Sequence, residues 1–227
     1  MTHKNSALYV AENLHFSYEI GSDKIEALKG ISITIPQSSV ICLAGPSGSG
    51  KSTLLSVLGL IEPIQQGTIR FNDQDLGSLN ETQKNHLRRY QIGFIFQRFH
   101  LLPVLSAQEN VEYFLARQGI PRKERTQYAL EALESVGLYD YRMKKPLEMS
   151  GGQQQRVAIA RALAKKPTVI IADELTASLD QNTGKEIMSL LRTLSEQKGA
   201  SVILASHDPM VFGFADRCYH IKNGEIV

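Results

Sequence analysis

The segment from Gly45 to Ser52 has the residue types and spacing of a loop that binds nucleotide phosphates. It matches the complete pattern G-x-x-x-x-G-K-[ST]. The glycines let backbone N–H groups turn toward a phosphate chain without Cβ clashes. Lys51 would place its charge on the β- and γ-phosphates, and Ser52 would place its hydroxyl on Mg²⁺. A helix that starts at Lys51 would also point its positive end at the anion. The predicted binding residues are Gly45, Pro46, Ser47, Gly48, Ser49, Gly50, Lys51, Ser52 and the adjacent Thr53.

Two carboxylates, Asp173 and Glu174, follow the apolar run 169–172. In a parallel sheet, ligands bind beyond the carboxyl ends of the strands. Asp173 is then placed to hold Mg²⁺, directly or through water. Glu174 is placed to polarise the water that attacks a γ-phosphate. An acidic pair alone is more often the solvated start of a loop, but the phosphate-binding loop upstream favours the catalytic interpretation.

A second glycine-rich segment, Met149-Ser150-Gly151-Gly152-Gln153, precedes a predicted helix. Ser150 and Gln153 have the spacing of a capping box. The two glycines leave the helix entrance bare, so that a second anion could approach its N–H groups. Capping alone would make this a plain helix start, and the residues by themselves favour that simpler interpretation.

The elements that must position these segments alternate between apolar strands and helices. Strands are predicted at 40–44, 67–71, 92–96, 169–172 and 202–205, and helices at 54–60, 153–164 and 181–198. This alternation is typical of an α/β domain with a largely parallel sheet. Residues 7–36 read as short β-like runs, whereas 98–149 reads as a helical insertion. Ser106 and Glu109 form a capping box there, Pro121 suits the first turn of a second helix, and Gly137 can end it.

Length and composition exclude several classes of protein. The 227 residues correspond to one domain, or one domain with a subdomain, at about 150 residues per domain. The chain is 42% hydrophobic with a net charge of +2, which argues against disorder and gives no reason to expect nucleic acid as a partner. Its two cysteines have no zinc-site spacing, and Cys42 is expected to be a free buried thiol. No window reaches the roughly 18 apolar residues of a membrane span, so no direct membrane insertion is expected.

Taken in order along the chain, the motifs resemble those of the nucleotide-binding subunit of ATP-binding cassette (ABC) transporters. The resemblance covers nearly the whole chain. The segments that carry it are 45–53, Gln97, 149–153, Ala172-Asp173-Glu174, Ser178-Leu179-Asp180 and His207. It implies an α/β P-loop NTPase core with an N-terminal antiparallel β-subdomain and an inserted α-helical subdomain at about 98–160, all within one nucleotide-binding domain, 1–227.

The resemblance also implies roles for single residues. Tyr18 would stack on adenine, although a strand-face aromatic is the alternative. Gln97 would touch Mg²⁺ and the attacking water and sense a membrane partner. His207 would contact the γ-phosphate as a switch histidine, and Asp180 would cross the dimer interface. The signature residues Ser150, Gly151, Gly152 and Gln153 would bind the γ-phosphate of ATP held by the opposite subunit.

The same resemblance implies ATP and Mg²⁺ as cofactors and three partners: ATP, a second copy of the chain, and integral-membrane permease subunits. The protein would hydrolyse ATP as a head-to-tail homodimer and power translocation. It would be cytoplasmic and peripheral on the inner membrane through the permease. The apolar stretch Phe99–Leu105 is a candidate partner site, with core packing as the alternative.

Within the family, residues 96–103 and the compact length resemble the branch of lipoprotein-release (Lol-type), macrolide-exporter (MacB-type) and cell-division (FtsE-type) ATPases. Lipoprotein release or substrate export is therefore expected. The alternative is a mechanotransmission ATPase that regulates a cell-wall enzyme and moves no cargo. Met149 stands where the signature usually has leucine, and Leu175 where proline usually follows the catalytic glutamate.

Three other classes of nucleotide-binding protein fit less well. Chromosome and repair ATPases carry very long heptad arms, but only about 100 residues without sustained heptads separate the phosphate loop from the signature. A tandem-cassette ribosome factor would need two phosphate loops. Glu174 argues against a module that binds nucleotide without hydrolysing it.

Overall fold

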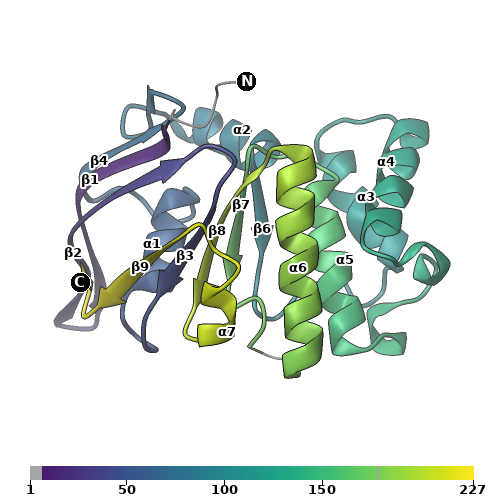
Figure 1. Ribbon diagram of the computed structural model, residues 1–227. Helices are drawn as coiled ribbons and strands as arrows, with labels where there is room; N and C mark the ends of the chain where they lie inside the picture. Colours follow the sequence, from purple (N-terminus) through teal and green to yellow (C-terminus); the bar gives the residue numbers. More distant parts are fainter. Residues whose placement is uncertain (1–6, 178) are drawn as a thin grey trace, which may run out of the picture.

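The computed structural model describes residues 7–177 and 179–227, and a six-stranded sheet forms its centre (Figure 1). The strand order is β10-β9-β3-β8-β7-β6, in which every neighbouring pair from β9 to β6 is parallel and β10 pairs antiparallel with β9. The bounds are β3 Val40–Ala44, β6 Ile92–Ile95, β7 Val169–Asp173, β8 Ser201–Ser206, β9 Arg217–Lys222 and β10 Glu225–Ile226. The predicted α/β P-loop arrangement with a largely parallel sheet is confirmed.

A second, four-stranded antiparallel sheet forms the predicted N-terminal β-subdomain. Its order is β2-β1-β4-β5, and its bounds are β1 Ala7–Ile20, β2 Asp23–Pro36, β4 Gln66–Phe71 and β5 Gln74–Asp75. The expected short runs at 7–36 are instead two strands of 14 residues each. A register shift between Ala11 and Leu14, with Asn13 at φ 50°, breaks the alternation that would have marked one long strand.

Alternate residues of the central strands enter two separate hydrophobic cores. Ile41 and Leu43 of β3 pack with the antiparallel sheet and with α1 (Lys51–Leu58), whereas Val40 and Cys42 pack with the helices of the opposite face. Because both faces are covered, these strands consist of buried residues and read as continuous apolar runs. Helix α1 contacts β7, β8 and β2, so it lies between the two sheets.

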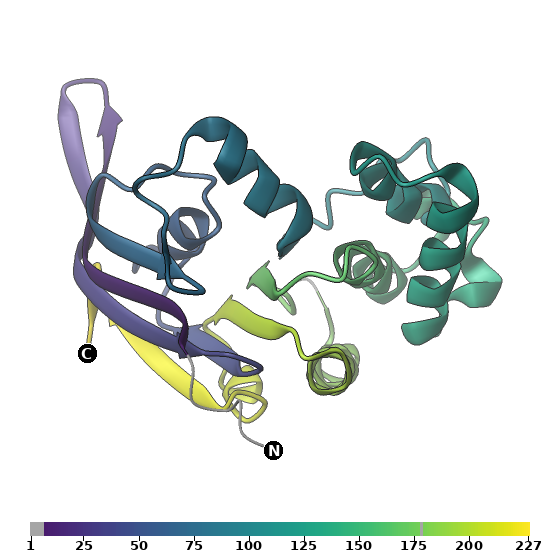
Figure 2. The ribbon, with the colours of Figure 1, turned by 90° about the horizontal axis from the view of Figure 1, so that it is seen from above.

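The helices of the middle of the chain cluster at one side of the molecule (Figure 2). They are α3 (Ala107–Arg117), α4 (Arg122–Ser135) and α5 (Gly151–Leu163), with 3₁₀ turns at Tyr139–Tyr141 and Pro146–Glu148. Ser106 and Glu109 form the predicted capping box, and Gly137 follows α4 at φ 72°. Pro121 is the N-cap of α4 and not a residue of its first turn.

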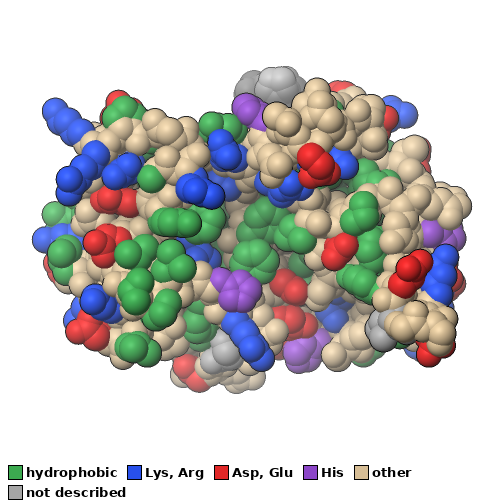
Figure 3. Space-filling model, turned by 180° about the vertical axis from the view of Figure 1, so that it is seen from behind, with side chains coloured by type: hydrophobic (Ala, Val, Ile, Leu, Met, Phe, Trp, Pro, Cys, Tyr) green, Lys and Arg blue, Asp and Glu red, His purple; other side chains and the backbone are tan. Residues whose placement is uncertain are grey.

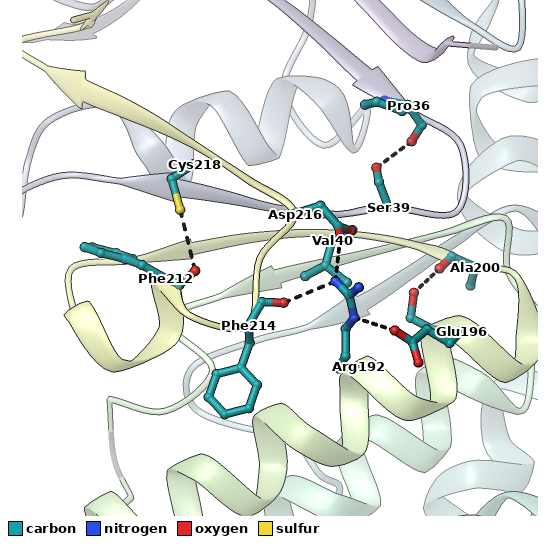
Figure 4. Close-up of polar contacts among 11 residues, drawn as sticks. Pro36, Ser39, Val40, Arg192, Glu196, Ala200, Phe212, Phe214, Asp216 and Cys218 are labelled. Carbon is teal, nitrogen blue, oxygen red and sulfur yellow. Dashed lines mark hydrogen bonds and ion pairs between the residues drawn. The ribbon is translucent and has the colours of Figure 1, made fainter. Parts of the chain in front are cut away.

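Three further helices complete the fold: α2 (Glu81–Tyr90), α6 (Gln181–Lys198) and α7 (Pro209–Phe212). Arg192 of α6 fixes the amino end of β3 through Asp216 (Figure 4). The Arg192 guanidinium lies 2.9 Å from Oδ1 of Asp216, and Oδ2 of Asp216 accepts a 2.8 Å hydrogen bond from the backbone N–H of Val40. This contact anchors the strand that leads into the phosphate-binding loop.

Candidate active site

Four parallel strands end at the same edge of the central sheet and bring the predicted site residues there. The phosphate-binding loop follows β3, Asp173 ends β7, His207 follows β8, and Gln97 lies two positions beyond β6. The register places Ala44 beside Ser206 and Asp173 beside Ala205. Residues far apart in the chain therefore converge at the carboxyl edge, where open α/β sheets bind ligands.

The phosphate-binding loop requires glycine at two positions. Gly45 has φ 154°, and a Cβ there would lie 2.2 Å from the carbonyl oxygen of Ile221. Gly50 has φ 105°, and a Cβ there would lie 2.5 Å from the carbonyl oxygen of Ala27. The glycines thus serve close packing as well as the turn that opens α1. The hydroxyl oxygen of Ser49 is buried in this loop and has no hydrogen-bond partner among the described residues.

Lys51, the first residue of α1, lies folded across the loop. Its Nζ donates hydrogen bonds to the carbonyl oxygens of Gly45, at 2.9 Å, and of Pro46, at 2.8 Å. Its side chain is only 5% exposed, and Nζ lies 4.0 Å from Oε1 of Glu174. A buried ammonium group held by carbonyl oxygens and one carboxylate is a strong site for an entering phosphate oxygen.

Ser52 and Asp173 provide oxygen ligands that fit Mg²⁺. The Ser52 hydroxyl donates a 3.1 Å hydrogen bond to Oδ1 of Asp173. Burial raises the pKa of the Asp173 carboxyl, against the opposing effect of the Ser52 hydrogen bond. A hydroxyl beside a partly desolvated carboxylate is the kind of oxygen pair that Mg²⁺ prefers. The predicted metal residue Gln97 is exposed in a turn, and its amide makes no hydrogen bond within the described part of the chain.

Glu174 and His207 form a hydrogen-bonded pair beside the loop. Nδ1 of His207 lies 3.0 Å from Oε1 of Glu174, and the histidine side chain is 60% exposed while the glutamate side chain is 16% exposed. Glu174 has φ 47°, and its N–H donates to the carbonyl oxygen of Ala205 at 3.1 Å. The β8 backbone and His207 therefore fix both the main chain and the carboxylate of the predicted base.

Tyr18 lies at one wall of a 250 Å³ pocket that the phosphate-binding loop also lines. Its hydroxyl lies 3.4 Å from the Thr53 hydroxyl, and its ring packs edge-on against Phe16. The ring is 37% exposed, which leaves a face for a planar ligand. The pocket is lined by Tyr18, Ala27, Gly48, Ser49, Gly50, Lys51, Ser52 and Thr53.

The Ser150 segment lies outside this pocket and caps α5. The Ser150 hydroxyl accepts from the N–H of Gln153, and Oε1 of Gln153 accepts from the N–H of Ser150. Gly152 packs against α6, where a Cβ would lie 2.7 Å from Cγ2 of Thr183. Asp180 caps α6 with two 3.1 Å hydrogen bonds. Among residues 7–177 and 179–227, no hydrogen bond or ion pair joins 149–153 to the phosphate-binding loop; Ser178 lies outside the described residues.

An apolar groove between the sheet and the helical region was not predicted from the sequence. Its volume is about 250 Å³. The sequence signal that could have revealed it is the pair Phe94 and Phe96, two aromatic residues spaced two apart at the end of β6. Figure 3 shows hydrophobic side chains exposed in several places across one face of the molecule. The lining residues are Ile61, Phe94, Phe96, Phe114, Arg161, Ala162 and Lys165.

The predicted partner stretch 99–105 divides into two kinds of residue. Phe99 and Leu101 pack against the hydrophobic core, so the packing alternative holds for them. Leu102 is 39% exposed and Val104 is 73% exposed. Leu102 and Val104, the exposed large hydrophobic residues of this stretch, offer an apolar surface to a partner. In the described residues, no helix is long and apolar enough to cross a membrane.

Comparison with known proteins gives one consistent result. The ABC transporter family model matches residues 28–177. The chain is 44% identical over 216 residues to macrolide export ATP-binding/permease proteins MacB of Shigella flexneri and Escherichia coli K12. The match covers 95% of this chain and 33% of those proteins, so the chain spans about a third of their length.

Two solved structures share the fold at substantial sequence identity. One is the dimeric post-hydrolysis state of the ATP-binding cassette MJ0796 bound to ADP and Pi, with a TM-score of 0.88, 39% identity and 96% coverage of both chains. The other is cbiO1 of Clostridium perfringens, part of the ABC transporter complex cbiONQ, with a TM-score of 0.88 and 31% identity over 97% of this chain and 87% of that chain.

Proposed function

Because the chain belongs to the ABC transporter family, in which it is an ATP-binding and ATP-hydrolysing cassette, we propose that it powers a membrane permease as a head-to-tail homodimer. Each ATP would lie between the phosphate-binding loop of one subunit and the signature of the other. The observation that carries this proposal is the separation of two phosphate-binding features. Ser150 caps the first turn of α5. In the described residues, no hydrogen bond or ion pair joins this turn to the loop that contains Lys51.

The residues at the sheet edge have distinct roles in this proposal. Lys51 exchanges its two carbonyl contacts for the β- and γ-phosphates. Ser52 and Asp173 would hold Mg²⁺, which would neutralise charge on those phosphates. Glu174 polarises the attacking water, and His207 orients its carboxylate. Little covalent work falls to the protein, since phosphoryl transfer is catalysed mainly by positioning and electrostatic stabilisation.

The remaining predicted residues belong to the proposed complete dimer. Tyr18 would stack on adenine, and Gln97 would contact Mg²⁺ and the attacking water. Ser150, Gly151, Gly152 and Gln153 bind the γ-phosphate from the opposite subunit, and Asp180 crosses the interface. Each chain would then carry half of each active site. This suits the chemistry, because the hydrogen-bond donors that stabilise the transition state need to be in place only when that state forms. Dimer closure would then assemble the catalytic arrangement.

Mixed dimers test the shared site. Lys51→Ala removes the phosphate lysine, and Ser150→Arg blocks the helix entrance, so each homodimer should be inactive. In a mixed dimer purified through two different tags, one site carries both defects and the other is intact. Phosphate release should therefore return in the mixed dimer.

The rescue experiment has a second arm, because two sites that must work together would also prevent rescue. Glu174→Gln protein, which keeps both binding faces, should form a dimer with ATP on size exclusion. No rescue together with a monomeric Glu174→Gln protein would contradict the shared site. A site built within one chain predicts that result.

The proposed permease binds at the apolar groove and at exposed apolar side chains of the segment that follows Gln97. Aromatic residues Phe94, Phe96 and Phe114 line the groove, and Val104 is 73% exposed. Exposed apolar and aromatic side chains of this kind commonly mark a surface that becomes buried when a partner protein binds. The macrolide relatives have names that pair ATP binding with a permease, which supports this class of partner. The chain would then act on the cytoplasmic face of the inner membrane, in lipoprotein release or substrate export.

Two valines provide a matched test of the permease site. Val104→Ser should reduce co-purification of the permease from membranes and leave the ATPase activity of the isolated cassette unchanged. Val227→Ser is the control, because Val227 is 74% exposed and lies at the C-terminus, away from the groove. Equal capture by both variants would contradict the site. Mass spectrometry of the captured partner also separates an exporter from a regulator of a cell-wall enzyme.

A further inference from the structure

The guanidinium group of Arg161, near the end of α5, holds the segment that follows Gln97. Its Nη1 donates to the carbonyl oxygen of His100 at 2.5 Å, and its Nη2 donates to that of Phe99 at 2.7 Å. Arg161 is 6% exposed and forms no ion pair with any carboxylate in the described residues. Burial lowers the pKa of Arg161 to about 10. A buried cation costs stability unless its donors are satisfied, and here the backbone of this segment satisfies them.

The backbone that Arg161 holds is in an uncommon conformation. Phe99 has φ 53° and His100 has φ 47°, although neither is glycine. The N–H of Phe99 donates to the carbonyl oxygen of Phe96 at 3.1 Å, which closes the turn around Gln97. Consecutive left-handed residues persist only where surrounding contacts hold them. The two hydrogen bonds from Arg161 are therefore among the contacts that hold the backbone just after Gln97.

The same helix begins at the other proposed functional segment. Ser150 is the N-cap of α5, and Arg161 lies in the last turn of this 13-residue helix. At 1.5 Å per residue the two positions are about 16 Å apart along the axis. A second cation just beyond the helix, Lys165, ties it to α2 and to the amino end of β6 through the carbonyl oxygens of Arg88 and Ile92, at 2.8 and 2.7 Å. Helix α5 is thus fastened to the amino end of β6 and to the segment that follows this strand.

We propose that Arg161 is a positioning residue for ATP hydrolysis, which couples the position of Gln97 to that of Ser150 through helix α5. The inference rests on the proposed function, because it uses the roles given there to Gln97 and Ser150. A shift of the Gln97 turn moves Arg161 and, with it, the helix that presents Ser150 to the opposite subunit. The rigid guanidinium fork suits this task, because it fixes two carbonyl groups at once, which a lysine ammonium does not do with the same geometry.

A double-mutant cycle distinguishes positioning from simple anchoring. Arg161→Lys keeps the charge and loses the fork, and it should lower kcat about tenfold with KM changed less than about twofold. In a Gln97→Ala background the same substitution should cause no further loss, since Arg161 acts through Gln97. Arg156→Lys is the matched control on the same helix, where Arg156 donates to the carbonyl oxygen of Val136 and pairs with Glu186. It should leave kcat within about twofold of wild type.

Hydrogen exchange gives a readout that does not depend on catalysis. Arg161→Lys should speed exchange of the backbone amides of 97–101, and Arg156→Lys should not. Unchanged exchange there, or equal losses of kcat with and without Gln97→Ala, would overturn the proposal. If Gln97→Ala alone keeps wild-type kcat, the role proposed for Gln97 is wrong. The exchange rates alone then decide whether Arg161 holds the backbone of 97–101.

Discussion

The hydroxyl of Ser52 donates a 3.1 Å hydrogen bond to Oδ1 of Asp173, a residue 121 positions later in the chain. Ser52 belongs to the first turn of α1, and Asp173 ends β7. The contact joins the start of α1, directly after the phosphate-binding loop, to the acidic end of β7, a strand of the same sheet as β3. The fold thus brings together the two oxygens proposed to bind Mg²⁺, at the cost of burying a carboxylate.

That cost makes the stability of the nucleotide-free protein depend on pH. Burial raises the pKa of Asp173 above its unfolded value, so the folded state holds this proton more tightly. The contribution of Asp173 to stability is therefore largest at low pH and is lost as pH rises through the raised pKa. Asp173→Asn removes the charge and should raise the thermal midpoint at pH 7. This gain should shrink as pH falls toward the carboxyl range.

Asp173→Asn should at the same time lose its response to Mg²⁺, since an amide is a weaker ligand for this cation than a carboxylate. Wild-type protein should be stabilised more by ATP with Mg²⁺ than by ATP with a chelator, and the variant should show little difference. Ser78→Ala, at an exposed serine outside the site, serves as the control. A variant that is destabilised at pH 7 and still responds to Mg²⁺ would contradict both the electrostatic cost and the metal role.

Lys51→Ala should reduce phosphate release by roughly 100-fold or more, because a buried cation on the transferred phosphoryl group is lost. The two carbonyl oxygens that Lys51 now satisfies, those of Gly45 and Pro46, would stay near the phosphates and repel them. ATP affinity should therefore fall as well, as measured by isothermal titration. Turnover at the wild-type rate would rule out the role proposed for Lys51.

The phosphate-binding loop and the acidic pair could be proposed from the sequence because each is contiguous and follows an apolar strand. The loop 45–52 and the pair Asp173 and Glu174 need no knowledge of distant contacts. What the sequence does not contain is their mutual geometry. The 3.0 Å contact of His207 with Glu174 arises from the parallel pairing of β7 with β8, which no local pattern encodes.

Elements with little buried surface were the ones that pattern analysis missed. Helix α2 buries only Leu87, so its sequence has no apolar periodicity, although Asn80 and Gln83 form a capping box that would have marked its start. The C-terminal strands β9 and β10 bury only Ile221. Phe99 shows the opposite failure, since an apolar residue that looked available to a partner packs against the core.

Leu175 stands where the family usually has proline, and substitutions there test whether the packing of its side chain stabilises the fold. Its side chain is 3% exposed and belongs to the core that contains α5 and α6. Leu175→Ala should lower the free energy of unfolding by about 2–4 kcal/mol, as large-to-small core substitutions do. Denaturant titration measures this value.

Met149→Leu is the companion variant. Met149 is 8% exposed and the substitution conserves volume, so the free energy of unfolding should change by less than about 1.5 kcal/mol.

Leu175→Pro should be less active as well as less stable. Glu174 has φ 47°, and a following proline disfavours helical backbone at the residue before it. In this chain the N–H of Glu174 donates to the carbonyl oxygen of Ala205, a contact that a change of the Glu174 backbone would disturb. The substitution should lower kcat more than Leu175→Ala does at a temperature where both are folded. Equal kcat values for the two variants would show that the backbone at Glu174 is insensitive to residue 175.

Glu174→Gln separates nucleotide binding from hydrolysis. The substitution keeps the shape of a side chain that lies 3.0 Å from His207 and 4.0 Å from Lys51, but it removes the base and one negative charge beside the phosphate site. Hydrolysis should stop, because a neutral amide does not accept the proton of the attacking water. ATP binding should be retained or strengthened, since less negative charge faces the γ-phosphate.

If ATP joins two copies of the chain, an ATP that is not hydrolysed should hold them together. Glu174→Gln should therefore elute as a dimer in ATP and as a monomer in ADP on size exclusion with light scattering. Adding Ser150→Arg should return the protein to a monomer in ATP, because the blocked entrance of α5 faces the opposite subunit. A Glu174→Gln protein that dimerises equally with and without Ser150→Arg would place the interface elsewhere, and normal hydrolysis by Glu174→Gln would assign the base to another residue.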